Sequence, residues 1–182
     1  MSIFFTRKGD DGYSGLLGKG RYPKEDDRFE ALGTVDELTS VLGFARSLCK
    51  APEVADIVIN VQRHLYLLMA ELAATEEQAS NFRNISNDHV VWLEQTIEQV
   101  QQLVEIPKEF IVPGDSVSGA VLDIARSVTR RAERRTAALF HRDLISNSVL
   151  LKYLNRLSSL CFILELREYQ FDGKERPTLV KP

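Results

Sequence analysis

Cysteine, histidine and long apolar runs are scarce in this 182-residue chain, and each shortage excludes a class of protein. The two cysteines, Cys49 and Cys161, lie far apart in apolar helical patterns, so we expect buried free thiols and no disulfide. The three histidines are scattered without HxxxH spacing, and no CxxC occurs, so no metal site built from protein ligands is predicted. No run of about 18 apolar residues and no N-terminal secretory pattern is present, which predicts a cytoplasmic protein without a membrane span.

The chain also lacks a net positive charge. Its formal charge is -3 at pH 7, with 23 Lys and Arg residues against 26 Asp and Glu residues. Nucleic acids and anionic membrane surfaces are polyanions that favour a basic protein face, so neither is expected as a general partner. With 44% apolar residues, a chain of this length can fill one core but is short for two, which predicts a single domain.

What the chain has instead is helical periodicity after a glycine-rich start. Thr34 and Glu37 form a T-x-x-E capping box, which predicts that the first helix begins at Thr34, and Pro52 suits the first position of the second helix. The apolar spacing predicts helices over about residues 34–49, 52–75, 87–106, 118–141 and 146–171, with Ser146 as the last N-cap and a loop over 76–86. The predicted fold class is therefore all-α: a five-helix bundle (34–171), an extended glycine-rich N-terminal loop (1–33) and a polar tail (172–182) that is flexible unless a partner or ligand orders it.

Residues 6–15, TRKGDDGYSG, hold three glycines, two cations and two adjacent aspartates. Such a segment has too few side chains to pack a core, so it exposes backbone N–H groups and adopts unusual dihedral angles. It is either a plain surface turn or a loop that holds an anion, for which Thr6, Arg7, Lys8, Ser14 and the later Lys24 supply donors. Neither the P-loop nor the G-x-G-x-x-G motif occurs, so a nucleotide site here would be assembled differently.

The segment ARSVTRRAERR, residues 125–135, contains five arginines and one glutamate. On a helix, Arg126, Arg130 and Glu133 form a row away from the core stripe. Arg134 lies beside that row, whereas Arg131 points elsewhere. Three interpretations follow: a solvated face with i,i+4 ion pairs, a nucleic-acid helix, or a site where planar guanidinium groups grip a polyphosphate. The chain lacks the wider basic surface that nucleic-acid binding requires, which disfavours the second.

Three further residues stand out. Asp36, in the first turn of the first predicted helix, is either a cap accessory or a functional carboxylate favoured by the helix dipole. Asn155 lies about 100 degrees from a core stripe, so it is either a surface amide or a group that reads a ligand. Phe110, in FIVPG, is by default a core or loop-anchoring aromatic.

The chain resembles the ATP:cob(I)alamin adenosyltransferases of the single-domain, five-helix, trimeric family. The resemblance covers nearly the whole chain and rests on five segments in the same order: TRKGDDGYSGLLG, RYPKEDDRFEALGTVDEL, FIVPG, ARSVTRRAERR and KYLNRLSSLCF. It implies a homotrimer whose ATP sites lie between neighbouring subunits. The residues that it implies around the nucleotide are Thr6, Arg7, Lys8, Gly9, Ser14, Gly15, Lys24, Arg130, Arg131, Ala132, Glu133, Arg134 and Asn155.

The same resemblance implies a reaction in which cob(I)alamin attacks the 5′ carbon of ATP, forming adenosylcobalamin and releasing triphosphate in the presence of Mg²⁺. The implied catalytic residues are Phe110, Arg126, Asp36 and Arg130. Asp36 would pair with Arg126, and Phe110 would press on the lower corrinoid face, which leaves cobalt four-coordinate and easier to reduce. No general acid or base is required, because the protein mainly positions the reactants and neutralises the leaving group. A corrinoid reductase and an adenosylcobalamin-dependent enzyme are the further partners implied.

Three positions depart from the pattern of that family: Asp115 in place of a second glycine, Asp123 in place of a histidine, and Ser159 in place of an aspartate. Asp123 lies one turn before Arg126, so we expect it to compete with Asp36 for that arginine. Asp115 raises a related question about the loop that carries Phe110. The alternative function is a catalytically silent homologue that binds ATP or corrinoid as a carrier, chaperone or sensor.

Overall fold

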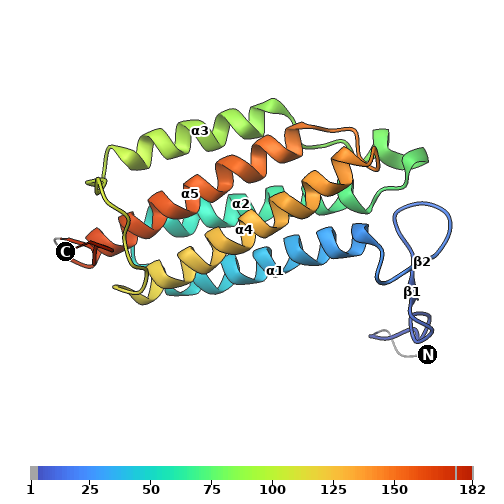
Figure 1. The fold of residues 1–182 in the computed structure, drawn as a ribbon, viewed down its shortest axis with the longest axis horizontal. Helices are drawn as coiled ribbons and strands as arrows, with labels where there is room; N and C mark the ends of the chain where they lie inside the picture. Colours follow the sequence, from blue (N-terminus) through green and yellow to red (C-terminus); the bar gives the residue numbers. More distant parts are fainter. Residues whose placement is uncertain (1–3, 175, 182) are drawn as a thin grey trace.

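The computed structural model describes residues 4–174 and 176–181, and within them five α-helices form an antiparallel bundle (Figure 1). Their bounds are α1 (Asp27–Leu48), α2 (Pro52–Ala73), α3 (Asn87–Gln101), α4 (Val117–His141) and α5 (Val149–Phe171). A 3₁₀ helix, η1 (Glu76–Asn81), lies in the stretch expected to be a loop, and two short strands, β1 (Tyr13–Ser14) and β2 (Tyr22–Pro23), pair near the N-terminus. The predicted all-α five-helix fold is confirmed.

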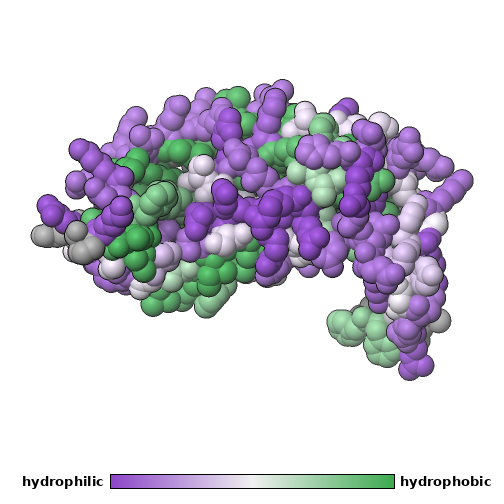
Figure 2. All heavy atoms as spheres, viewed as in Figure 1, coloured by the Kyte–Doolittle hydropathy of each residue, from purple (hydrophilic) through white to green (hydrophobic). Residues whose placement is uncertain are grey.

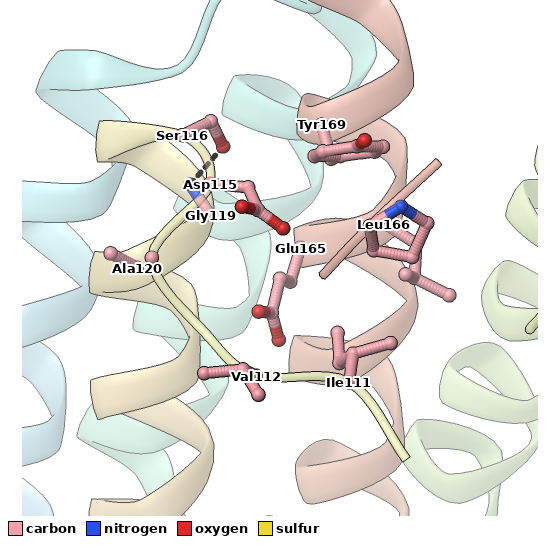
Figure 3. Close-up of a pocket in the computed structure, with 11 residues that line it drawn as sticks. Ile111, Val112, Asp115, Ser116, Gly119, Ala120, Glu165, Leu166 and Tyr169 are labelled. Carbon is pink, nitrogen blue, oxygen red and sulfur yellow. Dashed lines mark hydrogen bonds between the residues drawn. The ribbon is translucent and has the colours of Figure 1, made fainter. Parts of the chain in front are cut away.

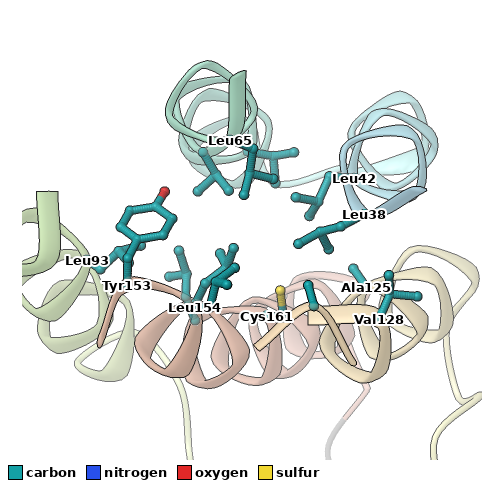
Figure 4. Packing of buried hydrophobic residues seen from close by; sticks show 14 of the residues in the cluster. Leu38, Leu42, Leu65, Leu93, Ala125, Val128, Tyr153, Leu154 and Cys161 are labelled. Carbon is teal, nitrogen blue, oxygen red and sulfur yellow. The ribbon is translucent and has the colours of Figure 1, made fainter. Parts of the chain in front are cut away.

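The core lies between the helices along the apolar stripes that periodicity predicts. Helix α4 packs against both α1 and α5, α1 packs against α2, and α3 packs against α5. Leu38, Leu65 and Tyr153 are fully buried, and Figure 4 shows their side chains directed from different helices into the space between them. Both cysteines are free thiols as expected, although Cys49 is only half-buried. Burial raises the pKa of the Cys161 thiol to about 12, so this cysteine is a packing residue and no nucleophile.

The start of α1 differs from the prediction. The helix begins at Asp27, and the N-cap is Asp26, whose carboxylate accepts a hydrogen bond from Arg28 N at 2.9 Å. Thr34 lies inside the helix and donates to Glu30 O at 2.7 Å, so the capping box at this residue was a wrong prediction. The physical reason is that Asp26 provides a cap about two helical turns upstream of Thr34, and Ala31, which is fully buried, continues the helical stripe between the two.

Two other helix ends also differ from their predicted positions. Helix α5 begins at Val149, and its N-cap is Ser148 instead of Ser146, without a side-chain cap bond. Asn147 Oδ1, one residue earlier, accepts a hydrogen bond from Val149 N at 3.1 Å. Helix α3 ends at Gln101 instead of just before Pro107, which leaves a longer connection to α4. That connection carries Phe110.

The N-terminal segment forms an arm that projects from the end of the bundle where α1 begins (Figure 1). The arm is fixed at its base, where Leu17 N donates to Ala73 O at 2.7 Å and Thr75 N donates to Leu17 O at 3.0 Å. Gly18 has φ +152, and a Cβ there would lie 2.0 Å from Thr75 Oγ1, so only glycine lets the arm pass this close to the bundle. In the described part of the chain, no helix is long and apolar enough to cross a membrane.

Candidate functional site

A cavity of about 560 Å³ opens between the loop before α4, the middle of α4 and the middle of α5. Phe110, Arg126 and Arg130 line it together, so the structure brings three of the four predicted catalytic residues to one place. Phe110 is 87% exposed, which means that its ring is presented to the cavity instead of anchoring the loop in the core. The default interpretation of this residue as a core aromatic was therefore wrong.

The cavity has further lining residues that the sequence did not single out for binding. Its walls include Pro107, Lys108, Glu109, Ile111, Pro113, Asp123, Ser158, Ser159 and Phe162. Two of them, Asp123 and Ser159, are positions where the chain departs from the family pattern. A cavity with both apolar and charged walls suits a ligand that has a flat apolar ring system and polar edges.

The arginines of α4 divide into paired and unpaired residues. Arg126 Nε donates to Asp123 Oδ1 at 2.7 Å, Arg131 pairs with Glu37 on α1, and Arg135 lies 3.7 Å from Glu30. Ion pairs therefore do cover part of the segment, but they run to Asp123 at i,i+3 and to α1 instead of following the expected i,i+4 spacing.

Two arginines of the segment, Arg130 and Arg134, are exposed and have no hydrogen bond or ion pair within residues 4–174 and 176–181. They lie one helical turn apart on the same face of α4. A guanidinium group without a carboxylate partner is available to an anionic ligand, and two on one face can bind a polyphosphate.

Asn155 and Glu133 lie beside each other across the α4–α5 interface. Asn155 Nδ2 donates to Glu133 Oε1 at 2.9 Å, and Arg156 Nη1 donates to Asn155 Oδ1 at 2.9 Å. The amide of Asn155 is thus held in one orientation by both neighbours. Ala132, between the predicted binding residues, is fully buried in the core, so its side chain cannot contact a ligand. Arg156 was missed, because nothing local in the sequence marks which residue orients an amide.

The glycine-rich arm is organised by an ion pair. Arg21 donates to both carboxylate oxygens of Asp11, at 2.7 and 2.8 Å, and to Tyr13 O at 3.0 Å. Hydrogen bonds from Arg21 and from the Tyr13 amide lower the pKa of Asp11 to about 2. Lys24 Nζ donates to Gly9 O at 2.7 Å, so this predicted ligand residue also shapes the loop. The Arg21–Asp11 pair escaped the sequence analysis because the two residues are separated by ten positions in an irregular segment.

The remaining predicted loop residues face solvent. The side chains of Thr6, Arg7 and Lys8 are exposed, and Arg7 adopts a left-handed backbone with φ 61. Gly15 is exposed, and Gly9 and Ser14 are half-exposed. The structure therefore leaves this loop accessible to a ligand.

Within one chain, the arm and the unpaired arginines do not meet. The arm projects away from the bundle (Figure 1), whereas Arg130 is on α4 and lines the cavity. The hydrogen bonds between the arm and the bundle join Leu17 to Ala73 and Thr75, at the end of α2. Asp36 is likewise exposed on α1 without a bonded partner in the described residues. Its predicted partner, Arg126, is bonded to Asp123 in the same chain.

A buried carboxylate, Glu165, lies next to the cavity that Phe110 lines. Glu165, on α5, is 5% exposed, and its Oε2 has no hydrogen-bond partner in the described residues. Figure 3 shows its side chain directed into a small pocket between α5 and the segment from Ile111 to Asp115. Burial and, secondly, the nearby charge of Asp123 raise the pKa of Glu165 to about 7, against an opposing effect of Arg126.

Comparisons with known proteins agree with this geometry. Residues 4–168 match the family model described as cobalamin adenosyltransferase. A corrinoid adenosyltransferase of Citrobacter freundii is 36% identical over 89% of this chain and 92% of its own length. The Citrobacter freundii corrinoid adenosyltransferase PduO is 37% identical over 92% of this chain, and the match spans 50% of that longer protein.

Among solved structures, a variant of the PduO-type ATP:corrinoid adenosyltransferase from Lactobacillus reuteri, complexed with cobalamin and ATP, superimposes with a TM-score of 0.89. It is 30% identical to this chain, and the match covers 98% of this chain and 99% of that one. The same fold thus accommodates both ligands in a related protein.

Proposed function

The chain belongs to the cobalamin adenosyltransferase family, and we propose that it transfers the 5′-deoxyadenosyl group of ATP to cob(I)alamin. The observation that carries this proposal is the cavity in which exposed Phe110 faces Arg126 and Arg130. An apolar ring and guanidinium groups around one space match the two substrates, a corrin ring and a polyphosphate.

The reaction is a displacement at carbon. The electron pair of Co(I) forms a Co–C bond to the 5′ carbon, the C–O bond to the triphosphate breaks, and its electron pair leaves with the triphosphate oxygen. Cobalt is formally oxidised from Co(I) to Co(III), and no proton is transferred. The protein therefore contributes by aligning the two substrates and by stabilising the charge that develops on the leaving group.

Arg130 and Arg134 are the residues that we assign to the triphosphate. Both lack partners among the described residues and are one turn apart, so they can reach adjacent phosphates without breaking an existing ion pair. The backbone N–H groups of the glycine-rich arm, with Lys8 and Lys24, are assigned to the same anion. Asn155, oriented by Arg156, is assigned to the nucleotide.

Phe110 is assigned to the lower face of the corrinoid. Its exposed ring would exclude water and the nucleotide-tail base from the axial position, which keeps cobalt four-coordinate and eases reduction of cob(II)alamin. The electron itself would come from a separate reductase, and the product would pass to an adenosylcobalamin-dependent enzyme.

We expect Mg²⁺ to bind together with ATP. In the part of the chain that the structure describes, no group of three or more His, Cys, Asp or Glu residues is arranged so that it could hold a metal ion. Mg²⁺ in nucleotide sites is commonly held by phosphate oxygens, water and one or two carboxylates, so we assign it to the triphosphate.

A homotrimer would bring the arm of one subunit to the arginines of the next. Exposed apolar side chains support such an assembly: Phe44, Val117 and Ile124 are each more than half exposed on α1 and α4. Figure 2 shows apolar side chains gathered over the end of the bundle where α4 begins. Phe44 and Val117 line one shallow hollow there, which is the kind of surface that a neighbouring subunit covers.

The test of this function is the anaerobic conversion of chemically reduced cob(I)alamin with ATP, followed by absorbance. Formation of adenosylcobalamin with stoichiometric triphosphate is expected. Binding of both substrates without conversion would instead support a carrier, chaperone or sensor.

A further inference from the structure

The loop that carries Phe110 is paired with the C-terminal tail of the same chain. We call residues 105–115 the Phe110 loop and residues 176–181 the tail strand. Val112 N donates to Thr178 O at 2.7 Å, and Val180 N donates to Phe110 O at 2.9 Å. These bonds flank an antiparallel bridge between Ile111 and Leu179. The tail strand therefore holds the backbone of Phe110 itself.

A carboxylate reinforces this pairing. Asp115 accepts from Thr178 N at 2.7 Å through one oxygen and from Thr178 Oγ1 at 2.9 Å through the other. Both oxygens of one side chain are thus used by one residue of the tail strand. Charge-assisted hydrogen bonds of this length are stronger than neutral ones, so Asp115 fixes the register in which Val112 and Val180 are bonded.

The Phe110 loop has a second attachment at its start. The side-chain amide of Gln170, at the end of α5, accepts from Glu105 N at 3.1 Å and donates to Glu105 O at 3.0 Å. Between the Gln170 and Asp115 attachments, the Phe110 ring is too exposed for packing to fix its direction. The direction of the ring therefore depends on the backbone, and the backbone depends on the tail strand.

We propose that Asp115 and Thr178 are positioning residues that hold the tail strand against the Phe110 loop and so set the Phe110 ring at the corrinoid face. The catalytic part of this proposal rests on the proposed function. The structural part does not, because the pairing can be measured without a substrate.

The location of the small pocket is consistent with this role. Asp115 of the Phe110 loop and Pro177 of the tail strand line this small pocket together with Glu165 of α5 (Figure 3). The two segments therefore jointly cover this part of α5. Loss of the Asp115–Thr178 contact would open this space to water and loosen both segments at once.

The experiment uses Asp115→Ala and Thr178→Val in the full chain, with Thr178→Ser as the matched control that keeps the hydroxyl. The first readout is hydrogen exchange at the amides of Val112 and Val180 without ligand. We expect exchange to accelerate about tenfold or more in Asp115→Ala, less in Thr178→Val, and to stay near the wild-type rate in Thr178→Ser.

The second readout separates positioning from general stability. Adenosylation is measured once from pre-reduced cob(I)alamin and once from cob(II)alamin with a reductant. We expect Asp115→Ala to lose about tenfold from cob(II)alamin and less than twofold from cob(I)alamin, with Thr178→Ser behaving as wild type.

Unchanged exchange at Val112 and Val180 in Asp115→Ala would overturn the proposal, and so would equal losses from both cobalt states. Failure of the proposed function would look different. In that case the wild-type chain would not convert cob(I)alamin at all, while the exchange measurement would still decide whether Asp115 holds the tail strand.

Discussion

Arg126 Nε donates to Asp123 Oδ1 at 2.7 Å, one turn earlier on α4, so the arginine expected to pair with Asp36 already has a carboxylate partner in its own chain. The two side chains are 32% and 18% exposed, which makes the contact less screened than a surface ion pair. Both line the cavity with Phe110. Asp123 thus bonds Arg126 within one chain, and whether it competes with Asp36 for this arginine stays a prediction.

Replacing Asp123 tests what this competition does. In Asp123→His, Arg126 loses its partner, which changes the wall of the cavity, and in the proposed trimer Arg126 becomes available to Asp36. We expect the corrinoid dissociation constant to change about threefold or more, measured by fluorescence or absorbance titration with ATP bound. The Ser159→Ala variant, in the same wall, serves as the control. An affinity equal to that of the wild type would remove this role of Asp123.

The unpaired arginines make a prediction about ATP. Removing Arg130 or Arg134 would delete the proposed charged contact to the triphosphate without breaking an ion pair, so each alanine variant should bind ATP about 10 to 100 times more weakly. Arg135→Ala is the matched control, because Arg135 lies beside Glu30 on the α1 side. Isothermal titration calorimetry measures all three. Equal weakening by Arg135→Ala would show that the effect is one of net charge alone.

Phe110→Ala should impair the reduction of cob(II)alamin much more than the transfer of the adenosyl group to cob(I)alamin. The ring is 87% exposed, so the variant should fold with a melting temperature close to that of the wild type. Conversion that starts from cob(II)alamin should fall by more than tenfold, whereas conversion of pre-reduced cob(I)alamin should fall much less. Similar losses in the two assays would contradict the axial-ligand role.

The raised pKa of Glu165 predicts that the stability of the folded chain depends on pH. Burial raises its pKa from 4.5 to about 7, so between these values the folded chain holds a proton that the unfolded chain has released. The contribution of this residue to the free energy of unfolding therefore falls as pH rises from about 4.5 to 7 and stays low above that. Glu165→Gln cannot ionise, so its melting temperature should exceed that of the wild type at pH 8, and the difference should shrink toward pH 5. A constant difference across this range would show that Glu165 does not titrate in it.

The sequence predicted the parts of this protein that follow from local pattern. The stripes containing Leu38, Leu65 and Tyr153 repeat at helical spacing, and they form the core. Helix ends were less predictable because caps compete: the Thr34 box fits the rule, but Asp26 lies earlier and its helix runs through Thr34.

The candidate site was predictable where residue types carry the chemistry and unpredictable where distant segments meet. Residue type marked Arg126 and Arg130 as candidates for an anion site, whereas Phe110 was named only through the family resemblance, and all three line one cavity. The contact of Asp115 with Thr178 joins residues far apart in the chain, so no local pattern indicates it. The tail was expected to be flexible without a partner or ligand, yet its described part pairs with the chain's own Phe110 loop.

The central claim is that the arm of one subunit and the arginines of the next share one triphosphate, and mixed assemblies test it most directly. A double variant of the arm, Lys8→Ala with Lys24→Ala, is co-expressed with Arg130→Ala, and trimers containing both chains are purified with two affinity tags. Each variant alone should be nearly inactive, whereas mixed trimers should recover about a third of the wild-type conversion rate, because one of the three sites in each mixed trimer combines an intact arm with an intact α4. Purified mixed trimers as inactive as either parent would contradict the account.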